Sequence, residues 1–347
     1  SQLEIADGTV PVDNEGNASE PVIELSHVSY SYSLSPRERR RWHKRSATAG
    51  KSSKQALWGN DPSSPWALRD VSLTVRRGEF LGLAGHTGSG KSTLVQHLNG
   101  LIRPQEGSVC ALGLDLSNKK DAAAVKAKVG VVFQYPERQL FAETVAQDVA
   151  FGPHNLGLPQ DEVDRRVASS LTRVGLDLST VGDKSPFELS GGQQRRVAFA
   201  GVLAMEPRVL ILDEASSMLD PRGRKGLMKA CRALHDRGMT IVMITHFMEE
   251  AAEADRVAVF QAGRVAMLGT PEEILTRANE LAQLNLDMPE SCRLGMALRA
   301  RGVPVHAQVR EADMVAKIAQ AYAERSGAGT VGQSSAPQSE IVDGTVS

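Results

Sequence analysis

The sequence contains few cysteines, almost no net charge and no long apolar run. Its three cysteines, Cys110, Cys231 and Cys292, are widely spaced along 347 residues. This odd, scattered set forms neither a disulfide framework nor a metal-binding pattern, so we expect the reduced thiols of a cytosolic protein. The formal net charge is −1 at pH 7 and 41% of the residues are hydrophobic, which is the composition of an ordinary globular chain.

No apolar stretch approaches the roughly 18 residues that a membrane-spanning helix requires. We therefore expect that the chain does not cross a bilayer by itself. Residues 1–21 are polar and acidic and lack the apolar segment of a secretory signal. Residues 1–21 and 326–347 are rich in Ser, Gly, Asp, Glu and Gln, and we expect both to be disordered tails.

An insertion between residues 33 and 66 contains a strongly basic segment, 37–45. Six of its nine residues are basic: Arg37, Arg39, Arg40, Arg41, Lys44 and Arg45. A solvated surface loop would explain this composition. A patch that touches a partner or anionic lipid headgroups would explain it too, because each basic residue near such a membrane adds about 1 kcal/mol. The sequence leaves both interpretations open.

Residues 85–92 read Gly-His-Thr-Gly-Ser-Gly-Lys-Ser, the pattern of a phosphate-binding loop for nucleoside triphosphates. The glycines let the backbone wrap around a polyphosphate, Lys91 adds a positive charge beside the outer phosphates, and Ser92 offers a hydroxyl to Mg²⁺. An apolar strand over 80–84 precedes the loop and a helix follows it, so the helix dipole points at the phosphates. The expected nucleotide contacts are Gly85, His86, Thr87, Gly88, Ser89, Gly90, Lys91, Ser92 and Thr93.

A second glycine-rich segment, Leu189-Ser190-Gly191-Gly192-Gln193, ends a mostly helical stretch over 135–200. We expect this stretch to be an inserted helical subdomain whose last helix begins at the motif. Residues 190–193 would then form a second helix N-terminus suited to an anion. Because the chain already has one phosphate loop, this second site makes most sense if it serves the nucleotide of another subunit.

Two carboxylates end the apolar strand 208–214, where successive side chains point in opposite directions. Asp213 could hold Mg²⁺, and Glu214 could orient the attacking water. The strand 240–246 should lie beside the first, so that His246 could donate a hydrogen bond near the γ-phosphate. Gln134 closes the strand 129–133 and could reach the metal or the water. A helix cap, a structural histidine and a surface glutamine are the alternative interpretations of these residues.

In this order and at these spacings, the motifs resemble an ATP-binding-cassette (ABC) ATPase over residues 22–280. The resemblance implies an α/β phosphate-loop ATPase core with an inserted helical subdomain and an antiparallel β region. It implies that Tyr32 stacks on adenine, although a core tyrosine is the alternative. Leu219-Asp220 matches the D-loop, which brings Asp220 to the nucleotide. ATP and Mg²⁺ are the implied cofactors.

A finer resemblance joins the chain to the cytoplasmic ATPases of energy-coupling-factor (ECF) importers, which take up vitamins or transition-metal ions. It rests on the segments 96–101, 133–141, 148–153 and 185–189. It implies a peripheral protein at the cytoplasmic face of the membrane. The implied partners are a second ABC ATPase (identical or paralogous), a transmembrane coupling subunit and a substrate-binding membrane subunit.

Most of the chain resembles the second of the paired ATPases of these importers. The segment Ala215-Ser216-Ser217-Met218 looks more like the first. Residues 134–141 run from Gln134 into the helical subdomain, so Tyr135, Leu140 and Phe141 could contact the coupling subunit. Glu137 could pair with a basic residue there. All four side chains could instead simply pack the subdomain.

Two other functions compete with an importer. A soluble ABC ATPase acting on ribosomes or DNA often has two cassettes or a long coiled coil before the second motif, and this chain has neither, so we expect no nucleic-acid partner. The lack of a membrane segment in the chain argues against the second alternative, the ATPase of an exporter. The remaining elements are an edge strand over 22–32, two strands over 256–268, a capping box at Thr270 and Glu273, and a helical appendix over 281–325.

Overall fold

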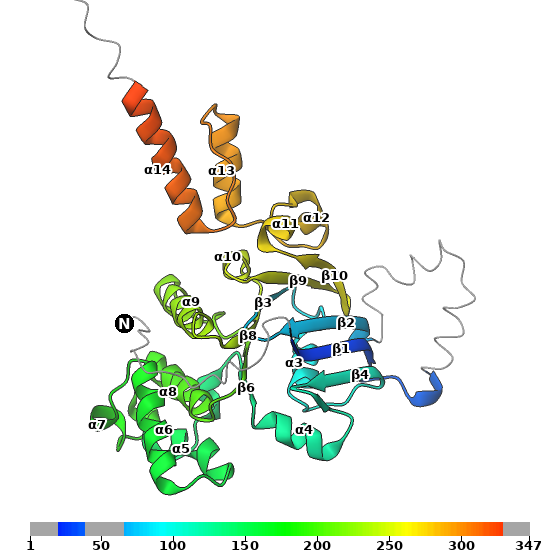
Figure 1. The fold of residues 1–347 in the computed structure, drawn as a ribbon, viewed down its shortest axis with the longest axis vertical. Coiled ribbons are helices and arrows are strands. Elements are labelled where there is room, and N and C mark those ends of the chain that lie inside the picture. The colour runs from blue at the N-terminus through cyan, green and yellow to red at the C-terminus, as the bar shows by residue number, and fades with distance from the viewer. Residues whose placement is uncertain (1–19, 39–65, 329–347) are drawn as a thin grey trace, which may run out of the picture. The chain divides into compact units, whose positions relative to one another are not determined.

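The computed structural model describes residues 20–38 and 66–328 (Figure 1). Nearly all of the two expected tails, and most of the basic segment 37–45, lie outside the described residues. The chain divides into two compact units, residues 1–288 and 289–347. Every strand found in the described part of the chain belongs to the first unit.

A six-stranded sheet forms the centre of the first unit, in the order β10-β9-β3-β8-β7-β6. Neighbours from β9 to β6 are parallel, whereas β10 pairs antiparallel with β9. The strands are Phe80–Ala84 (β3), Val129–Val132 (β6), Val209–Asp213 (β7), Thr240–Thr245 (β8), Arg256–Gln261 (β9) and Arg264–Gly269 (β10). Because β3, β8 and β7 are parallel neighbours, Gly85, His246 and Glu214 follow them at the same edge of the sheet.

Side chains of this sheet alternate between two hydrophobic layers. In β7, Leu210 and Leu212 pack with the helical subdomain and with α9 (Pro221–His235). Val209 and Ile211 face α3 (Lys91–Leu98) and a second sheet. Both faces are covered, which is usual for a parallel sheet and explains why its strands are continuous apolar runs in the sequence.

The second sheet is antiparallel, in the order β2-β1-β4-β5. Its strands are Pro21–Tyr30 (β1), Leu68–Arg76 (β2), Glu106–Ala111 (β4) and Leu114–Asp115 (β5), and α4 (Lys119–Lys126) follows. The predicted edge position of the first strand is wrong, because β1 lies between β2 and β4. Its alternating pattern arises from one buried and one exposed face, which interior strands of such sheets also have.

Residues 135–204 are largely helical and pack on the sheet beside β6 and β7 (Figure 1). Ser190 caps α8, and its side chain accepts a hydrogen bond from the backbone N–H of Gln193. Thr144 caps α5 in the same way through Gln147. The elements are Pro136–Gln139 (η1), Val145–Asn155 (α5), Gln160–Arg173 (α6), Leu178–Val181 (α7), Pro186–Glu188 (η2) and Gly191–Ala204 (α8).

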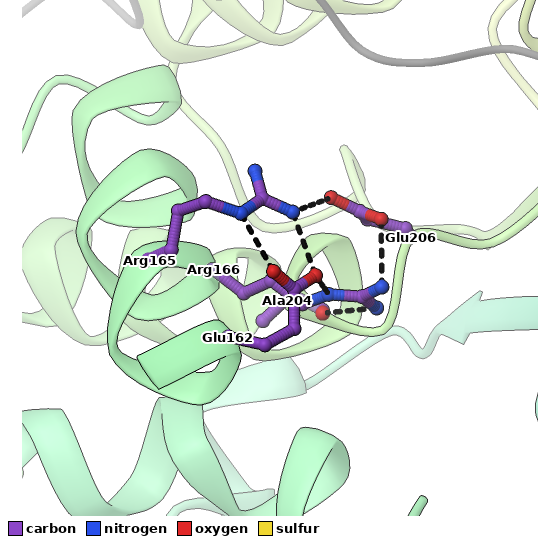
Figure 2. Close-up of polar contacts among 5 residues, drawn as sticks. All are labelled: Glu162, Arg165, Arg166, Ala204 and Glu206. Atoms are coloured by element: carbon purple, nitrogen blue, oxygen red, sulfur yellow. Dashed lines mark hydrogen bonds and ion pairs between the residues drawn. The ribbon is translucent and has the colours of Figure 1, made fainter. Parts of the chain in front are cut away.

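A cluster of ion pairs joins α6 to the end of α8, as Figure 2 shows. Arg166 lies 2.6 Å from Glu162 and 2.9 Å from Glu206, and Arg165 pairs with the same two carboxylates at 2.7 and 3.4 Å. Arg166 also donates a hydrogen bond to the Ala204 carbonyl. Arg165 first and then Arg166 lower the pKa of Glu162 to about 2. The cluster therefore adds polar contacts between α6 and the C-terminal end of α8, beside the apolar core that the two helices share.

Short helices occur towards the end of the first unit, one between β8 and β9 and two after β10. Thr270 and Glu273 form the predicted capping box at the start of α11. The helices are Met248–Ala251 (α10), Pro271–Leu275 (α11) and Ala278–Gln283 (α12). The second unit contains α13 (Glu290–Ala300) and α14 (Glu311–Ala328), with a small core around Val305, Met314 and Ala321. Among the described helices, none is both long and apolar enough to cross a membrane.

Candidate functional site

The phosphate loop connects β3 to α3 and depends on glycine for its shape. Gly90 caps α3 with φ of 107°, and a Cβ there would lie 2.4 Å from the Ala67 carbonyl oxygen. Gly85 has φ of 150°, and a Cβ there would lie 2.5 Å from the Phe260 carbonyl oxygen. A side chain at either position would collide with backbone, so the loop requires glycine at both.

Lys91 folds back into this loop and is buried. Its ammonium donates hydrogen bonds to the carbonyls of Gly85 at 2.6 Å and His86 at 2.9 Å, and to the Ser89 hydroxyl at 3.3 Å. Burial lowers the pKa of Lys91, and the charges of Glu214 and then Asp213 oppose this. The carbonyls of the loop accept the hydrogen bonds of the Lys91 ammonium. A phosphate could replace these carbonyls as acceptor, and because the ammonium is already buried, no further cation would have to be buried.

Asp213 ends β7 and Glu214 directly follows it, and both carboxylates lie close enough to Lys91 for their charges to act on its pKa. Burial, and then the neighbouring charge of Glu214, raises the pKa of Asp213 to about 6, while Lys91 opposes the rise. Glu214 has φ of 50°, and its backbone N–H donates to the Ile244 carbonyl of β8 at 3.0 Å. This paired, half-buried negative charge is an environment that a cation would stabilise.

The three expected metal ligands, Ser92, Gln134 and Asp213, have donor atoms that suit Mg²⁺ better than a transition metal. All three offer oxygen atoms, which Mg²⁺ prefers, and Mg²⁺ binds through few protein groups together with phosphate. Within the described residues, no cluster of three or more His, Cys, Asp or Glu could hold a metal by itself. The residues present therefore suit a cation that arrives with a nucleotide.

His246 and Gln134 approach the same region from two further strands. His246 follows β8, and its Nδ1 lies 4.0 Å from Glu214 Oε2. Gln134 follows β6, and its Nε2 donates a hydrogen bond to the Ser217 hydroxyl at 3.3 Å. The structure thus brings Lys91, Asp213, Glu214 and His246 to one edge of the sheet and connects Gln134 to the loop after Glu214.

Tyr32 lies beside the helix that begins in the phosphate loop. Its hydroxyl donates to Gln96 Oε1 at 3.2 Å and lies 3.4 Å from Thr93 Oγ1. The residue is 64% exposed, so the alternative of a core tyrosine is wrong. Its ring packs edge-on against Tyr30 with centroids 5.0 Å apart. An exposed, braced ring next to the phosphate loop can stack on a nucleobase.

The segment Ser190–Gly192 lies exposed at the N-terminus of α8. Ser190 and Gln193 form a capping box there. A Cβ at Gly191 or Gly192 would meet no atom within 4 Å, so packing inside the chain does not require glycine at these positions. Asp220 caps α9 and accepts a hydrogen bond from the Gly223 N–H at 2.7 Å.

One buried carboxylate, Glu250, was not expected from the sequence. It accepts hydrogen bonds from the Ser216 hydroxyl at 2.8 Å and the Thr245 hydroxyl at 2.5 Å, so it ties the loop after β7 to the end of β8. Burial raises its pKa, and these two bonds oppose the rise. Ser216 lies 34 residues away, and no local pattern marks a glutamate on a short helix as buried.

The segment after Gln134 only partly matches expectation. Glu137 pairs with Arg195 of the same chain, with 3.1 Å between Oε2 and Nε, so it already has a basic partner. Leu140 is 6% exposed and belongs to the core, which rules it out as a contact surface. Phe141 is 60% exposed and packs edge-on against the half-exposed Phe151, with centroids 4.8 Å apart.

Residues 68–217 match the ABC transporter family. The chain is 53% identical over 273 residues to the energy-coupling factor transporter ATP-binding protein EcfA2 of Symbiobacterium thermophilum, covering 77% of this chain and 94% of that protein. It is 48% identical over 258 residues to EcfA1 of the same organism, covering 74% of this chain and 89% of that protein.

Among solved structures, the chain is similar to CbiO1 of Clostridium perfringens, described as part of the ABC transporter complex CbiONQ. The match has a TM-score of 0.62 and 33% identity, and it covers 81% of this chain and 99% of that one. The chain therefore belongs to the ATP-binding proteins of energy-coupling factor transporters, within the ABC family, and is an ATPase.

Proposed function

We propose that the chain powers an ECF-type importer of a vitamin or transition-metal ion, as the second of two paired ATPases at the cytoplasmic face of the membrane. The observation that carries the proposal is the meeting of Lys91, Asp213 and Glu214 at the phosphate loop in a chain of this family. The assignment as the second ATPase is supported because the chain has a higher identity to EcfA2 of Symbiobacterium thermophilum than to EcfA1 of the same organism.

In this proposal, residues 85–93 bind the phosphates of ATP and Tyr32 stacks on its base. Magnesium, held by Ser92, Gln134 and Asp213, would neutralise charge on the phosphates. Glu214, which directly follows Asp213, would orient and polarise the attacking water. The Nδ1 of His246 lies 4.0 Å from that carboxylate, too far for a hydrogen bond, and with ATP bound it would move closer to donate one near the γ-phosphate and orient Glu214 and the water.

The segment 190–193 and Asp220 serve the nucleotide of the partner ATPase. Support comes from Gly191 and Gly192, because they are exposed and the chain's own packing does not require them. A helix N-terminus with free N–H groups can bind the γ-phosphate of a nucleotide held by the other subunit. ATP binding would close the two subunits together, and hydrolysis would let them open.

Phe141 and Phe151 give a candidate surface for the transmembrane coupling subunit. They are exposed on the helical subdomain, and Phe141 lies seven residues after Gln134. An exposed aromatic pair is a common anchor in protein interfaces. Movement of the subdomain around Gln134 would then reach the membrane subunits, including the one that captures the solute.

The test is Glu214→Gln in the complex assembled with its membrane subunits. Because glutamine keeps the size but cannot accept a proton, ATP turnover should fall about 10²-fold or more while ATP still binds. Solute uptake into vesicles should stop with it. Near-normal turnover would assign catalysis to another residue. ATP-driven release of solute by the wild-type complex would contradict an importer.

A further inference from the structure

Arg195 connects three functional segments of the chain. Its Nε and Nη2 donate to the two carboxylate oxygens of Glu137 at 3.1 and 3.4 Å, and its Nη1 donates to the Met218 carbonyl at 3.1 Å. A guanidinium can make all three bonds at once because its donors are arranged as a planar fork. A lysine ammonium, with a single nitrogen, cannot span the same acceptors.

Each partner of Arg195 belongs to a motif with a proposed catalytic role. Glu137 lies three residues after Gln134 in the same segment, and Met218 precedes Asp220 in the loop after Glu214. Arg195 itself is on α8, in the second turn after Ser190. The hydrogen bond from Gln134 to Ser217 joins two of these segments a second time. Residues 134–137 and 217–218 are therefore held together at two points, one of them through α8.

The environment of the Arg195 contact favours a defined geometry. The side chains of Arg195 and Glu137 are 23% and 20% exposed, so solvent screens their charges less than it does a surface pair. A two-point contact with one carboxylate also fixes the orientation of the guanidinium. A shift of α8 along its axis must therefore move the loop after Glu214, move Glu137, or break these bonds.

We propose that Arg195 is a positioning residue for ATP hydrolysis, which transmits the position of the helix that begins at Ser190 to Gln134 and to the loop carrying Glu214. The proposal rests on the catalytic roles assigned above to those two residues. When the partner's nucleotide engages residues 190–192, α8 takes a fixed position. Arg195 then sets Gln134 and Glu214 relative to each other, although it touches neither the water nor the phosphate.

The same subdomain provides a matched control in the cluster of Figure 2. Arg166 pairs with two carboxylates and donates a hydrogen bond to a backbone carbonyl, whereas Arg195 pairs with one carboxylate through two nitrogens and likewise donates to a backbone carbonyl. Its partners are Glu162, Glu206 and Ala204, none of which belongs to the proposed catalytic segments. Loss of Arg166 therefore reports what loosening the subdomain does by itself.

The experiment compares Arg195→Ala, Arg195→Lys, Glu137→Gln and Arg166→Ala in the assembled complex, with kcat, KM and the affinity for a fluorescent ATP analogue as readouts. Both Arg195 variants should lower kcat about tenfold while affinity changes by less than about twofold, since residues in one network couple on this scale. The kcat of Glu137→Gln should lie between that of the Arg195 variants and that of wild type, because the glutamine amide keeps one oxygen that can accept a hydrogen bond from Arg195. Arg166→Ala should lower the melting temperature and leave kcat unchanged.

Unchanged kcat in both Arg195 variants would overturn the proposal, and so would an equal loss in Arg166→Ala. If Arg195→Ala does not fold, Arg195→Lys and Glu137→Gln decide by the same criteria. Glu214→Gln is measured in parallel to separate this inference from the proposed function. Loss of turnover in Glu214→Gln with normal Arg195 variants refutes only the positioning role. Normal turnover in Glu214→Gln refutes the catalytic assignment itself.

Discussion

Lys91 shows most directly how a single residue depends on the loop around it. Its ammonium is buried and hydrogen-bonded to the carbonyls of Gly85 and His86. We expect Lys91→Ala to abolish or greatly weaken ATP binding, because no other described side chain places an ammonium in this loop. Equilibrium binding of a fluorescent ATP analogue measures the loss, and circular dichroism checks the fold.

Lys126→Ala is the control, since this lysine is exposed at the end of α4. It should bind the nucleotide like wild type. A folded Lys91→Ala protein with wild-type affinity would contradict the phosphate-loop assignment.

Residues of the site could be predicted where their chemistry is local in the sequence. The phosphate loop, the Asp213-Glu214 pair and the cap at Ser190 each need only a few consecutive residues, so their pattern identifies them. Glu250 and Arg195 could not be found in this way. Their partners are brought close by the sheet and by α8, and a single sequence contains no signal for such long-range pairs.

At the scale of elements, an ion pair joins the end of α9 to the central sheet. His235 Nε2 lies 3.0 Å from Asp255 Oδ2, and the same oxygen accepts a hydrogen bond from the Phe80 N–H at 2.8 Å. The bond to Asp255 raises the pKa of His235, against the effect of burial. Burial pushes the pKa of Asp255 up, but the bonds from His235 and Phe80 hold it below its usual range.

This pair predicts a pH-dependent contribution to stability. Folded His235 binds its proton more tightly than the unfolded chain does, so the contribution is complete below about pH 6.5 and is lost as pH rises through the raised pKa. On the acid side it is lost as pH falls below about 4 and Asp255 takes up a proton. The contribution should be at most about 1 kcal/mol, since solvent reaches both side chains.

His235→Gln keeps a neutral donor and removes the charge. The difference in melting temperature between wild type and this variant should be largest between about pH 5 and 6 and should shrink towards about pH 8. His154→Gln, at an exposed histidine near the end of α5, is the control for loss of a surface imidazole outside this pair. If the difference in melting temperature between wild type and His235→Gln does not change with pH, the prediction that His235 and Asp255 form a charged pair is wrong.

Strands could be predicted from the sequence where both faces of their sheet are buried. The strands β3, β7 and β8 read as continuous apolar runs because both faces of the central sheet are covered, and the helical stretch before α8 was predicted as well. The position of β1 in its sheet was not, because an alternating pattern reports one buried face and gives no information about neighbouring strands. Strand order is decided by contacts between distant segments.

At the scale of the whole molecule, the proposed function divides each nucleotide site between two subunits, so that one chain would contribute to two different sites. The phosphate loop around Lys91 would bind the subunit's own ATP, and Gly192 at the start of α8 would bind the partner's. A Cβ at Gly192 meets no atom within 4 Å, so Gly192→Asp should fold normally. In a dimer of identical chains it should still stop turnover, since a carboxylate there repels the γ-phosphate.

Mixing two inactive variants tests this division of the site. A dimer of one Lys91→Ala chain and one Gly192→Asp chain has one site in which both halves are wild type. A one-to-one mixture should therefore recover about a quarter of the wild-type turnover if chains pair at random in two-fold dimers. As control, mixing Lys91→Ala with the Lys91→Ala/Gly192→Asp double variant leaves no intact phosphate loop and should recover nothing. No recovery in the first mixture, with mixed dimers detected by native mass spectrometry, would contradict a site shared between two copies of this chain.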